Sequence, residues 1–294
     1  MAIALPSLQV IELRGLDAVA FAHAQFSSDV RTQYNGQWQF STWLSPQGRV
    51  RAFFHLLRDA DDRLRMVLRG GNPGEVAAAL TRFIFRSKVE LRVLEDIQVF
   101  GCTQAQAIAE CCGDVAQGTT TTGNVQHTSL CIQGETSRWL LLLDAGSSKP
   151  SSTEPGMDRN QWRLADIRAG LPELAPALQE QLLPQWLGLD RLGAISVNKG
   201  CYPGQEIIAR LHFKGGNKRS LYLVEFDGVG PPEANAHLVS CDERQESAGR
   251  IVMAAQSAEN RIVALAALHD ELAKACLRFT DSPGREIGAR IRFD

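Results

Sequence analysis

The sequence lacks long hydrophobic runs. Its longest apolar stretch covers residues 262–268, whereas a membrane-spanning helix needs about 20 consecutive apolar residues. The first residues, MAIALP, carry no basic charge and lead into no apolar core with a cleavage site, so they do not resemble a secretory signal peptide. We therefore expect a soluble protein without a membrane partner, and we assign it to the cytoplasm.

The sequence also lacks an excess of charge of one sign. It contains 31 Lys and Arg against 33 Asp and Glu, and its formal net charge is −2. Proteins that bind nucleic acids usually show a basic excess or a basic stripe, and no such run is present. We therefore expect no direct contact with nucleic acid.

Two further absences concern the seven cysteines. They form no CxxC pair, their number is odd, and the chain is far longer than the small domains that depend on disulfides. We therefore expect reduced thiols. No cluster of cysteines or histidines has the spacing of metal ligands, so the sequence predicts no metal site.

What the sequence does contain is the composition of a globular protein, with 44% hydrophobic and 22% charged residues. Its 294 residues suggest about two domains. Helices that lie between runs of alternating strands indicate an α+β fold. We expect an α+β unit at 1–95, a second α+β unit at 96–215 that is interleaved with the first, and an all-β unit, barrel or sandwich, at 216–294.

The apolar patterns predict individual elements within these units. In the first unit they are a strand at 8–13, a helix capped by Asp17, strands at 38–43 and 50–54 around the turn 45–48, a strand at 64–68 and a helix from Pro73. In the later units they are a helix at 104–112, strands near 125–132 and 138–143, a surface loop at 145–156, and strands at 221–226 and 251–253.

The densest cluster of unusual residues is NKGCYPGQE, at 198–206. Here we predict that a strand ends at 195–197 and that a helix begins at Pro203. Cys201 would then precede a helix N-terminus, and Lys199 adds a positive charge; both favour a thiolate. Gly200 and Gly204 leave room for a ligand or another backbone. The alternatives are that Cys201 is a small buried apolar residue and that Glu206 and Arg210, spaced i, i+4, form an ordinary surface pair.

The string KGCYPGQE resembles the signature of the YgfZ family, whose members are related to the aminomethyltransferase (T protein) of the glycine cleavage system. Three other blocks match the same family: QFSSDV at 25–30, SPQGRV at 45–50, and WRLADIRAGLP at 162–172. The resemblance covers residues 8–226.

The resemblance implies a T-protein-like fold, with ferredoxin-like α+β domains and a C-terminal antiparallel β-barrel around a central channel. It implies tetrahydrofolate as the cofactor and iron–sulfur proteins as the clients, which the protein helps to assemble or repair. The Cys201 thiol would be the functional group. The other motif residues are Lys199, Gly200, Tyr202, Gly204, Gln205, Glu206 and Arg210. The folate-binding residues would be Trp162, Arg168, Gln25 and Asp29, with the Trp162 indole on the pterin ring. The alternative for Trp162 is a core aromatic.

The sequence also departs from the aminomethyltransferases. Arg168 stands where they carry a glutamate that binds the pterin, and residues 49–52, just after the hairpin glycine, supply no carboxylate where the aminomethyltransferases carry aspartates. Leu8 replaces a second tryptophan of some family members. Because the acid–base groups of methylene transfer are missing, we expect an accessory factor rather than an enzyme. The alternative is a folate-dependent aminomethyltransferase or demethylase. A third possibility, direct tRNA modification, conflicts with the neutral charge, so we expect any effect on tRNA to be indirect.

Overall fold

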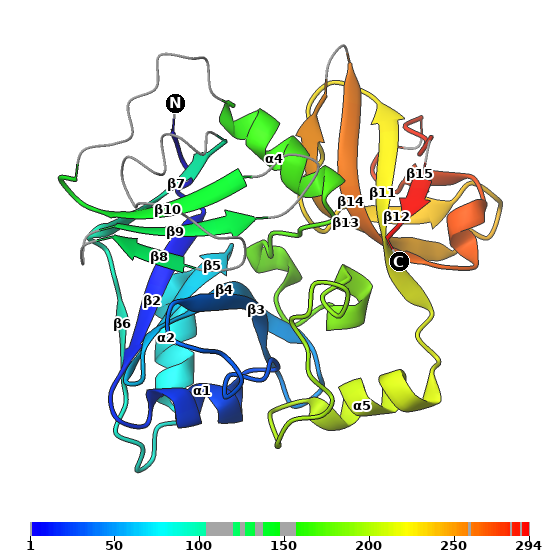
Figure 1. Ribbon diagram of the computed structural model, residues 1–294. Coiled ribbons are helices and arrows are strands. Elements are labelled where there is room, and N and C mark those ends of the chain that lie inside the picture. Colours follow the sequence, from blue (N-terminus) through cyan, green and yellow to red (C-terminus); the bar gives the residue numbers. More distant parts are fainter. Residues whose placement is uncertain are drawn as a thin grey trace.

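The computed structural model describes residues 2–103, 120–123, 127–132, 138–147, 157–257, 260–282, 284–288 and 290–293. They form three antiparallel sheets, together with helices that join and cover them (Figure 1). The predicted helix at 104–112 lies outside the described residues. No helix of the described part combines the length and the apolar character needed to cross a bilayer.

The first sheet has the strand order β3-β4-β5-β2-β6. Its strands are β2 (Leu8–Arg14), β3 (Gln37–Leu44), β4 (Val50–Ala60), β5 (Arg63–Arg69) and β6 (Glu90–Val93). Alternate residues, such as Ile11 and Met66, pack against α1 (Ala18–Gln25) and α2 (Pro73–Thr81), because side chains of a strand alternate between faces. The helix at Pro73 begins as predicted, with Asn72 accepting the backbone N–H groups of Gly74 and Glu75.

The second sheet has the order β1-β7-β10-β9-β8. It contains β1 (Ile3–Ala4), β7 (Ile97–Cys102), β8 (Thr120–Gly123), β9 (His127–Ile132) and β10 (Arg138–Asp144). The strand β1 comes first in the chain, yet it pairs with β7 through Ile3 and Gly101. The N-terminal residues therefore belong to the second sheet, while the residues that follow them build the first.

The third sheet has the order β15-β12-β13-β14-β11-β16. Its strands are β11 (Arg219–Asp227), β12 (His237–Ser240), β13 (Ser247–Gln256), β14 (Arg261–His269), β15 (Leu277–Phe279) and β16 (Arg290–Arg292). In the described part of the chain the edge strands β15 and β16 do not pair with each other, so the closed barrel that the resemblance implies is not confirmed.

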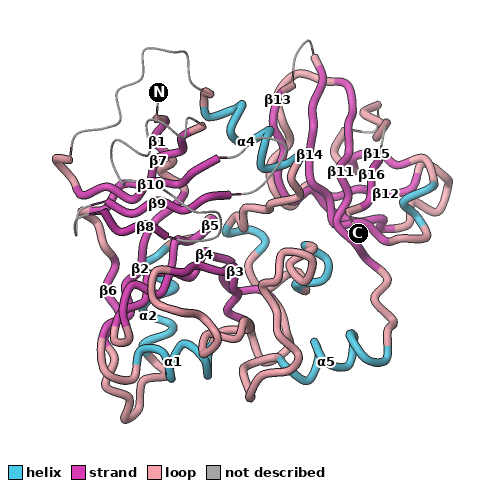
Figure 2. Tube along the Cα trace, viewed as in Figure 1, coloured by secondary structure: helices cyan, strands magenta, loops and turns pink. Residues whose placement is uncertain are grey.

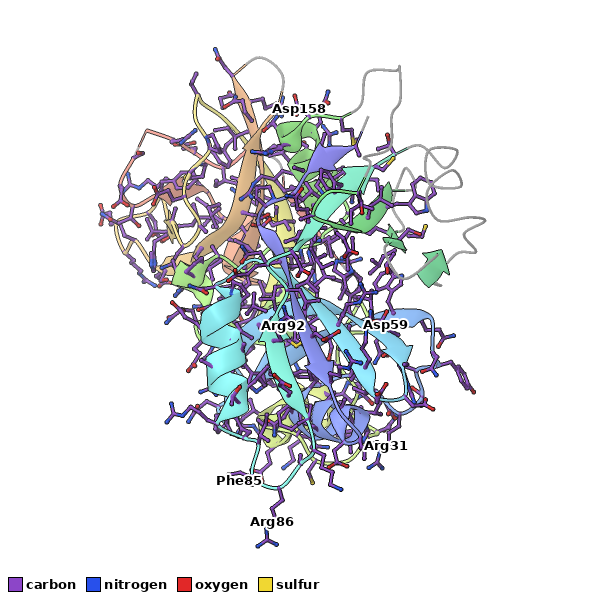
Figure 3. All side chains as sticks on the ribbon, turned by 90° about the vertical axis from the view of Figure 1, so that its left-hand side faces the viewer. Arg31, Asp59, Phe85, Arg86, Arg92 and Asp158 are labelled. Carbon is purple, nitrogen blue, oxygen red and sulfur yellow. A yellow bond between two sulfur atoms is a disulfide. The ribbon has the colours of Figure 1, made fainter. Side chains whose placement is uncertain are left out.

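Helix α4 (Arg159–Arg168) lies between the second and third sheets (Figure 1). It begins at a capping box in which Asp158, labelled in Figure 3, accepts the backbone N–H of Gln161. The side chains of Asn160 and Arg163 donate to carbonyls of β13, at Gln256 (2.7 Å) and Ala254 (2.9 Å). The helix is thus fixed to the third sheet from one side.

The C-terminal half of α4 carries a buried ion triad. Asp166 accepts from Arg69 of β5 at 2.8 Å and from Arg138 of β10 at 2.7 Å, and all three side chains are at most 5% exposed. Because the two guanidinium groups come from the first and second sheets, the single carboxylate joins both sheets to the helix.

Three sequence predictions are wrong. Residues 195–197 form no strand but belong to a long loop between α4 and α5 (Figure 2). Helix α5 is Gln205–Lys214 and does not begin at Pro203, because Gly204 has φ +79°, outside the helical region. Finally, Cys241 and Cys276 form a disulfide, so the cysteines are not all thiols; residues 35 apart in the chain are brought together by the pairing of β12 with β15.

Candidate functional site

Lys199 anchors the thiol loop, which we define as residues 194–204, beneath the end of α1. Its ammonium group donates to the backbone oxygens of His23 (2.5 Å), Phe26 (2.5 Å) and Ser28 (2.9 Å). These carbonyls lie at the negative end of the helix dipole. A lysine has three N–H donors, and all three are used here. Lys199 therefore holds the loop to α1 and has no hydrogen bond left for the Cys201 thiol.

Burial lowers the pKa of Lys199 to about 8, and Arg31 lowers it as well, while Asp29 opposes the shift. The side chain is 9% exposed. It also lies 5.0 Å from the centre of the Tyr202 ring. Tyr202 is itself buried, which raises its pKa to about 12, and its hydroxyl donates to the Ser196 oxygen. Both motif residues thus stabilise the loop from inside.

Gly204 and Gly48 bring the thiol loop against the β3–β4 hairpin turn. A Cβ at Gly204 would lie 2.6 Å from the Ser45 oxygen, and one at Gly48 would lie 3.1 Å from the Ile207 Cβ. Both glycines also have positive φ, +79° and +73°. The close approach predicted at Gly204 is therefore made to another segment of backbone, the turn at 45–48.

The remaining motif residues line the outside of α5. Gln205 Nε2 donates to the Lys199 oxygen at 3.4 Å, which closes the loop on itself. Glu206 and Arg210 are exposed, and among the described residues they form no ion pair with each other. The ordinary surface pair considered for them is thus not formed.

Cys201 itself faces solvent. Of the free cysteines in the described ranges, Cys102 and Cys131 are buried and Cys201 is exposed. The alternative that Cys201 is a small buried residue is therefore wrong. Within the described ranges, Cys201 is thus the accessible free thiol, and it lies on a loop that Lys199 and Gly204 hold in place.

His23 lies beside the residue that precedes this thiol. Its Nε2 is 3.6 Å from the position that a Cβ would take at Gly200, and its Nδ1 is 3.3 Å from Asp29 Oδ1. Burial lowers the pKa of His23, as do the positive charges of Lys199 and Arg31, against the effect of Asp29. The imidazole is therefore neutral at pH 7, with Nδ1 oriented by Asp29 and Nε2 directed toward the loop.

A cavity of 620 Å³ lies on the other side of β3. Its described lining residues are Trp38, Gln39, Phe40, Cys131, Ile132, Ala169, Leu171, Arg191, Leu192 and Gly193. This volume lies in the usual range of small-molecule pockets, about 300–1,000 Å³. The Trp38 indole N–H is buried without a hydrogen-bond partner, which is uncommon for a buried donor. The cavity thus offers two aromatic rings and the positive charge of Arg191.

A buried histidine supports the aromatic wall. The His55 ring lies 5.0 Å from that of Trp38 and 4.7 Å from that of Phe40. Complete burial, and then the charge of Arg69, hold the pKa of His55 well below its usual value. A neutral ring therefore packs behind both aromatic side chains.

The cavity and the thiol loop share Gln39 as a common wall. Gln39 lines the cavity, and its amide donates to Ser28 Oγ (3.0 Å) and to the Asp29 oxygen (3.1 Å). Ser28 in turn accepts from Lys199. Hydrogen bonds through Ser28 therefore connect Gln39 of the cavity lining to Lys199 of the thiol loop.

The structure separates the four residues for which the resemblance implies folate binding. Asp29 lies near Lys199, and Gln25, the last residue of α1, has a buried Oε1 with no hydrogen-bond partner among the described residues. Trp162 is 3% exposed, packs on Gly101 and lies 4.8 Å from the Arg138 guanidinium, so it is a core aromatic outside the cavity lining. Arg168 is exposed and immediately precedes Ala169 of that lining.

The sequence analysis did not identify Trp38, Phe40 and Arg191 as site residues. Trp38 and Phe40 have the alternation of a core strand, and only the meeting of β3 with β9 and the 169–193 segment shows that their face borders a cavity. Leu8, noted as a replaced tryptophan, is buried in the core.

Comparison with known proteins places these features in a family. No protein-family model matches the chain. An uncharacterized protein of Haemophilus influenzae is 30% identical over 222 residues, which cover 75% of this chain and 72% of the relative. The tRNA-modifying protein YgfZ of Sodalis glossinidius is 28% identical over 286 residues, which cover 94% of this chain and 87% of the relative. The chain belongs to the YgfZ family.

The fold of this YgfZ-family member is that of an aminomethyltransferase. The crystal structure of the glycine cleavage system aminomethyltransferase T from Bartonella henselae matches it with a TM-score of 0.73, over 97% of this chain and 83% of that one. Their sequences are 15% identical, so the likeness concerns the fold. The YgfZ family predicted from the motifs is confirmed, and so is a mixed α/β fold similar to that of the T protein, whereas the closed barrel is not confirmed.

Proposed function

We propose that this protein is a tetrahydrofolate-binding accessory factor that acts through the Cys201 thiol in the assembly or repair of iron–sulfur proteins in the cytoplasm. The observation that carries the proposal is the aromatic cavity that shares Gln39 with the thiol loop. Occupancy of the cavity by folate thereby adjusts the loop that presents the thiol to a client protein.

The residues of the cavity fit a reduced folate. A pterin is a flat ring system, so it stacks on Trp38 or Phe40. Arg191, although it already donates to the oxygens of Ala169 and Gly170, adds positive charge for the folate carboxylates. Arg168, at the rim, pairs with the glutamate tail. Trp162 supports this site from the core. When bound, tetrahydrofolate supplies a carrier for one-carbon units.

The absence of acids at this site favours an accessory role over methylene transfer. Among the described lining residues of the cavity there is no carboxylate. After the hairpin, Arg49 donates to the Gln181 oxygen and Arg51 pairs with Glu180 at 2.8 Å, so both are used in packing. General acid–base catalysis at the folate nitrogens has no group here to perform it. This favours the accessory factor over the alternative, an aminomethyltransferase or demethylase.

The link to tRNA is indirect in this proposal. The relative from Sodalis glossinidius is named a tRNA-modifying protein, but this chain has a net charge of −2 and therefore lacks the basic excess of nucleic-acid binders. We therefore propose that the clients include iron–sulfur enzymes that thiolate tRNA. Such clients would explain an effect on tRNA modification by a protein that does not itself bind tRNA.

The cavity is tested by titration with tetrahydrofolate, followed by tryptophan fluorescence. We expect saturable binding by the wild type. Trp38→Ala removes a ring on which the pterin stacks, a contact worth about 1 kcal/mol, so the Kd rises about fivefold. Trp162→Phe, away from the lining, changes it less. No binding by the folded wild type would overturn the folate part of the proposal.

The thiol is tested separately, in cells that lack the protein. Complementation by the wild type restores the activity of iron–sulfur enzymes and the level of thiolated tRNA nucleosides. We expect Cys201→Ser to bind tetrahydrofolate normally and to restore neither. Full complementation by Cys201→Ser would show that the thiol is not the functional group, whereas tRNA binding by the pure protein would point to direct modification.

A further inference from the structure

A group of two cysteines and one glutamate lies in the third sheet, apart from the thiol loop. Cys241 follows β12 and Cys276 precedes β15, and these two strands are paired at Ser240 and Leu277. The third member, Glu286, pairs with Arg278 of β15. Three ligand-type side chains therefore come from three neighbouring backbone segments.

Backbone hydrogen bonds hold these segments together independently of the sulfur atoms. The Cys241 N–H donates to the Cys276 oxygen at 3.0 Å, and the Ile287 N–H donates to the Leu277 oxygen at 2.8 Å. When the bond between the two sulfurs is broken, these contacts keep Cys241, Cys276 and Glu286 adjacent. The arrangement is thus built into the sheet rather than imposed by the disulfide.

The three side chains have the chemistry and the proximity of metal ligands. The two Sγ atoms and a carboxylate oxygen of Glu286 all lie within 4.8 Å of one another. Two thiolates and a carboxylate are a donor set that Zn²⁺ accepts, with water in the fourth tetrahedral position. Thiolates select zinc over magnesium or calcium, which prefer oxygen ligands.

Exposure makes the sulfur pair accessible to a reductant. Cys276 and Glu286 are exposed and Cys241 is half-buried. A thiolate can therefore attack the disulfide from solvent, as exchange requires. In the oxidised form the sulfurs are bonded to each other and are not available as thiolate ligands.

We propose that Cys241, Cys276 and Glu286 form a redox-gated zinc site. A dithiol reductant transfers two electrons and two protons to the Cys241–Cys276 disulfide and is itself oxidised to a disulfide. The two resulting thiols release their protons to solvent as Zn²⁺ binds both sulfurs and the Glu286 carboxylate. Oxidation reverses the process: the sulfurs give two electrons to a disulfide oxidant, re-form their bond and release the ion. This site does not rest on the proposed folate function.

The test uses the full chain with Cys111 and Cys112 replaced by serine, so that these two cysteines, adjacent in the sequence, cannot supply zinc ligands. The protein is reduced with a phosphine, freed of reductant without oxygen, and titrated with Zn²⁺ against a chromophoric chelator. We expect one site per reduced chain, none in the oxidised chain, and two protons released per ion bound at a pH where both thiols are protonated.

Matched variants locate the ligands. Cys276→Ser removes a thiolate and weakens binding at least about 100-fold, and Glu286→Gln weakens it about tenfold. Glu271→Gln, an exposed acid outside the group, and Cys201→Ser, an exposed thiol outside the group, leave it unchanged. If Cys276→Ser fails to fold, two measurements still test the proposal. A thiol count before and after reduction of the parent chain shows whether the disulfide opens, and zinc titration of Glu286→Gln shows whether this carboxylate is a ligand. Absence of binding by the reduced chain, equal binding by the oxidised chain, or loss with Cys201→Ser would overturn the proposal.

Discussion

Two of the blocks that carry the family resemblance occupy very different surroundings. The block at 199–206 lies on the surface, held by hydrogen bonds from Lys199 to the end of α1, and it presents Cys201 to solvent. The block at 162–172 is largely buried, with Trp162 in the core and Asp166 between two arginines. The difference teaches that an unusual sequence block can encode either accessible chemistry or the framework that supports it.

Removal of the buried carboxylate is the most severe test of this comparison. Asp166→Asn leaves Arg69 and Arg138 charged and buried without a counter-ion, so we expect the free energy of unfolding to fall by about 3–5 kcal/mol. Urea unfolding measures it. The matched variant Glu225→Gln breaks the partly exposed pair with Arg261 and should cost less than about 1 kcal/mol. Equal losses in the two variants would contradict the framework role of Asp166.

The contact between the surface block and the hairpin turn is tested by comparing two glycine-to-alanine substitutions. Gly216→Ala places a Cβ in open space at φ +88°, and costs about 1–2 kcal/mol of unfolding free energy for the left-handed backbone alone. Gly204→Ala, at φ +79°, adds a contact of 2.6 Å with the Ser45 oxygen. We expect about 2 kcal/mol more destabilisation, measured by urea unfolding. Equal losses of unfolding free energy in Gly204→Ala and Gly216→Ala would show that the hairpin turn shifts to accept the added Cβ and does not hold the thiol loop in place.

The next smaller effect is the pH dependence of stability that two buried histidines, His55 and His23, produce. The pKa values of His55 and His23 are lowered in the folded state, so the unfolded chain binds protons first as the pH falls below about 6.5. The wild type should therefore lose up to about 1.4 kcal/mol of unfolding free energy per pH unit and per histidine between pH 6.5 and 5. His55→Gln should flatten this slope by one histidine's share.

The smallest expected effect concerns the thiol. Because the neutral Nε2 of His23 faces Gly200, beside Cys201, it is placed to accept the thiol proton. His23→Gln should slow alkylation of Cys201 by iodoacetamide about three- to tenfold at pH 7, a factor that corresponds to the loss of about one hydrogen bond. Mass spectrometry of the modified peptide gives the rate, with His237→Gln as control. An unchanged rate would mean that His23 serves only to anchor Asp29.

Local signals predicted local structure well. Asn72 and Pro73 fix the start of α2 by their own chemistry, and the SPQG turn joins β3 to β4 as expected. The start of α5 was mispredicted, because the conformation of Gly204 depends on its contact with a hairpin more than 150 residues earlier. Residues 195–197 are apolar enough for a strand, but they pack as a loop against the core.

The candidate site was predictable in part for the same reason. The motif identified Cys201 and its neighbours, because they are consecutive in the sequence. The cavity required β3, β9 and the segment before the thiol loop to meet, and the sulfur group required β12 and β15 to pair. Neither contact leaves a trace in residue spacing, so both sites emerged only from the tertiary structure.

The pairing of β1 with β7 has a consequence for the order of events during translation. The ribosome delivers Ile3 and Ala4 first, but their partners Gly101 and Phe100 emerge only after the whole first sheet has been synthesised. The nascent first sheet therefore forms while the leading segment is still without a partner. A bulky fusion placed ahead of Ile3 would then delay completion of the second sheet and leave an edge of β7 open to pairing with another chain.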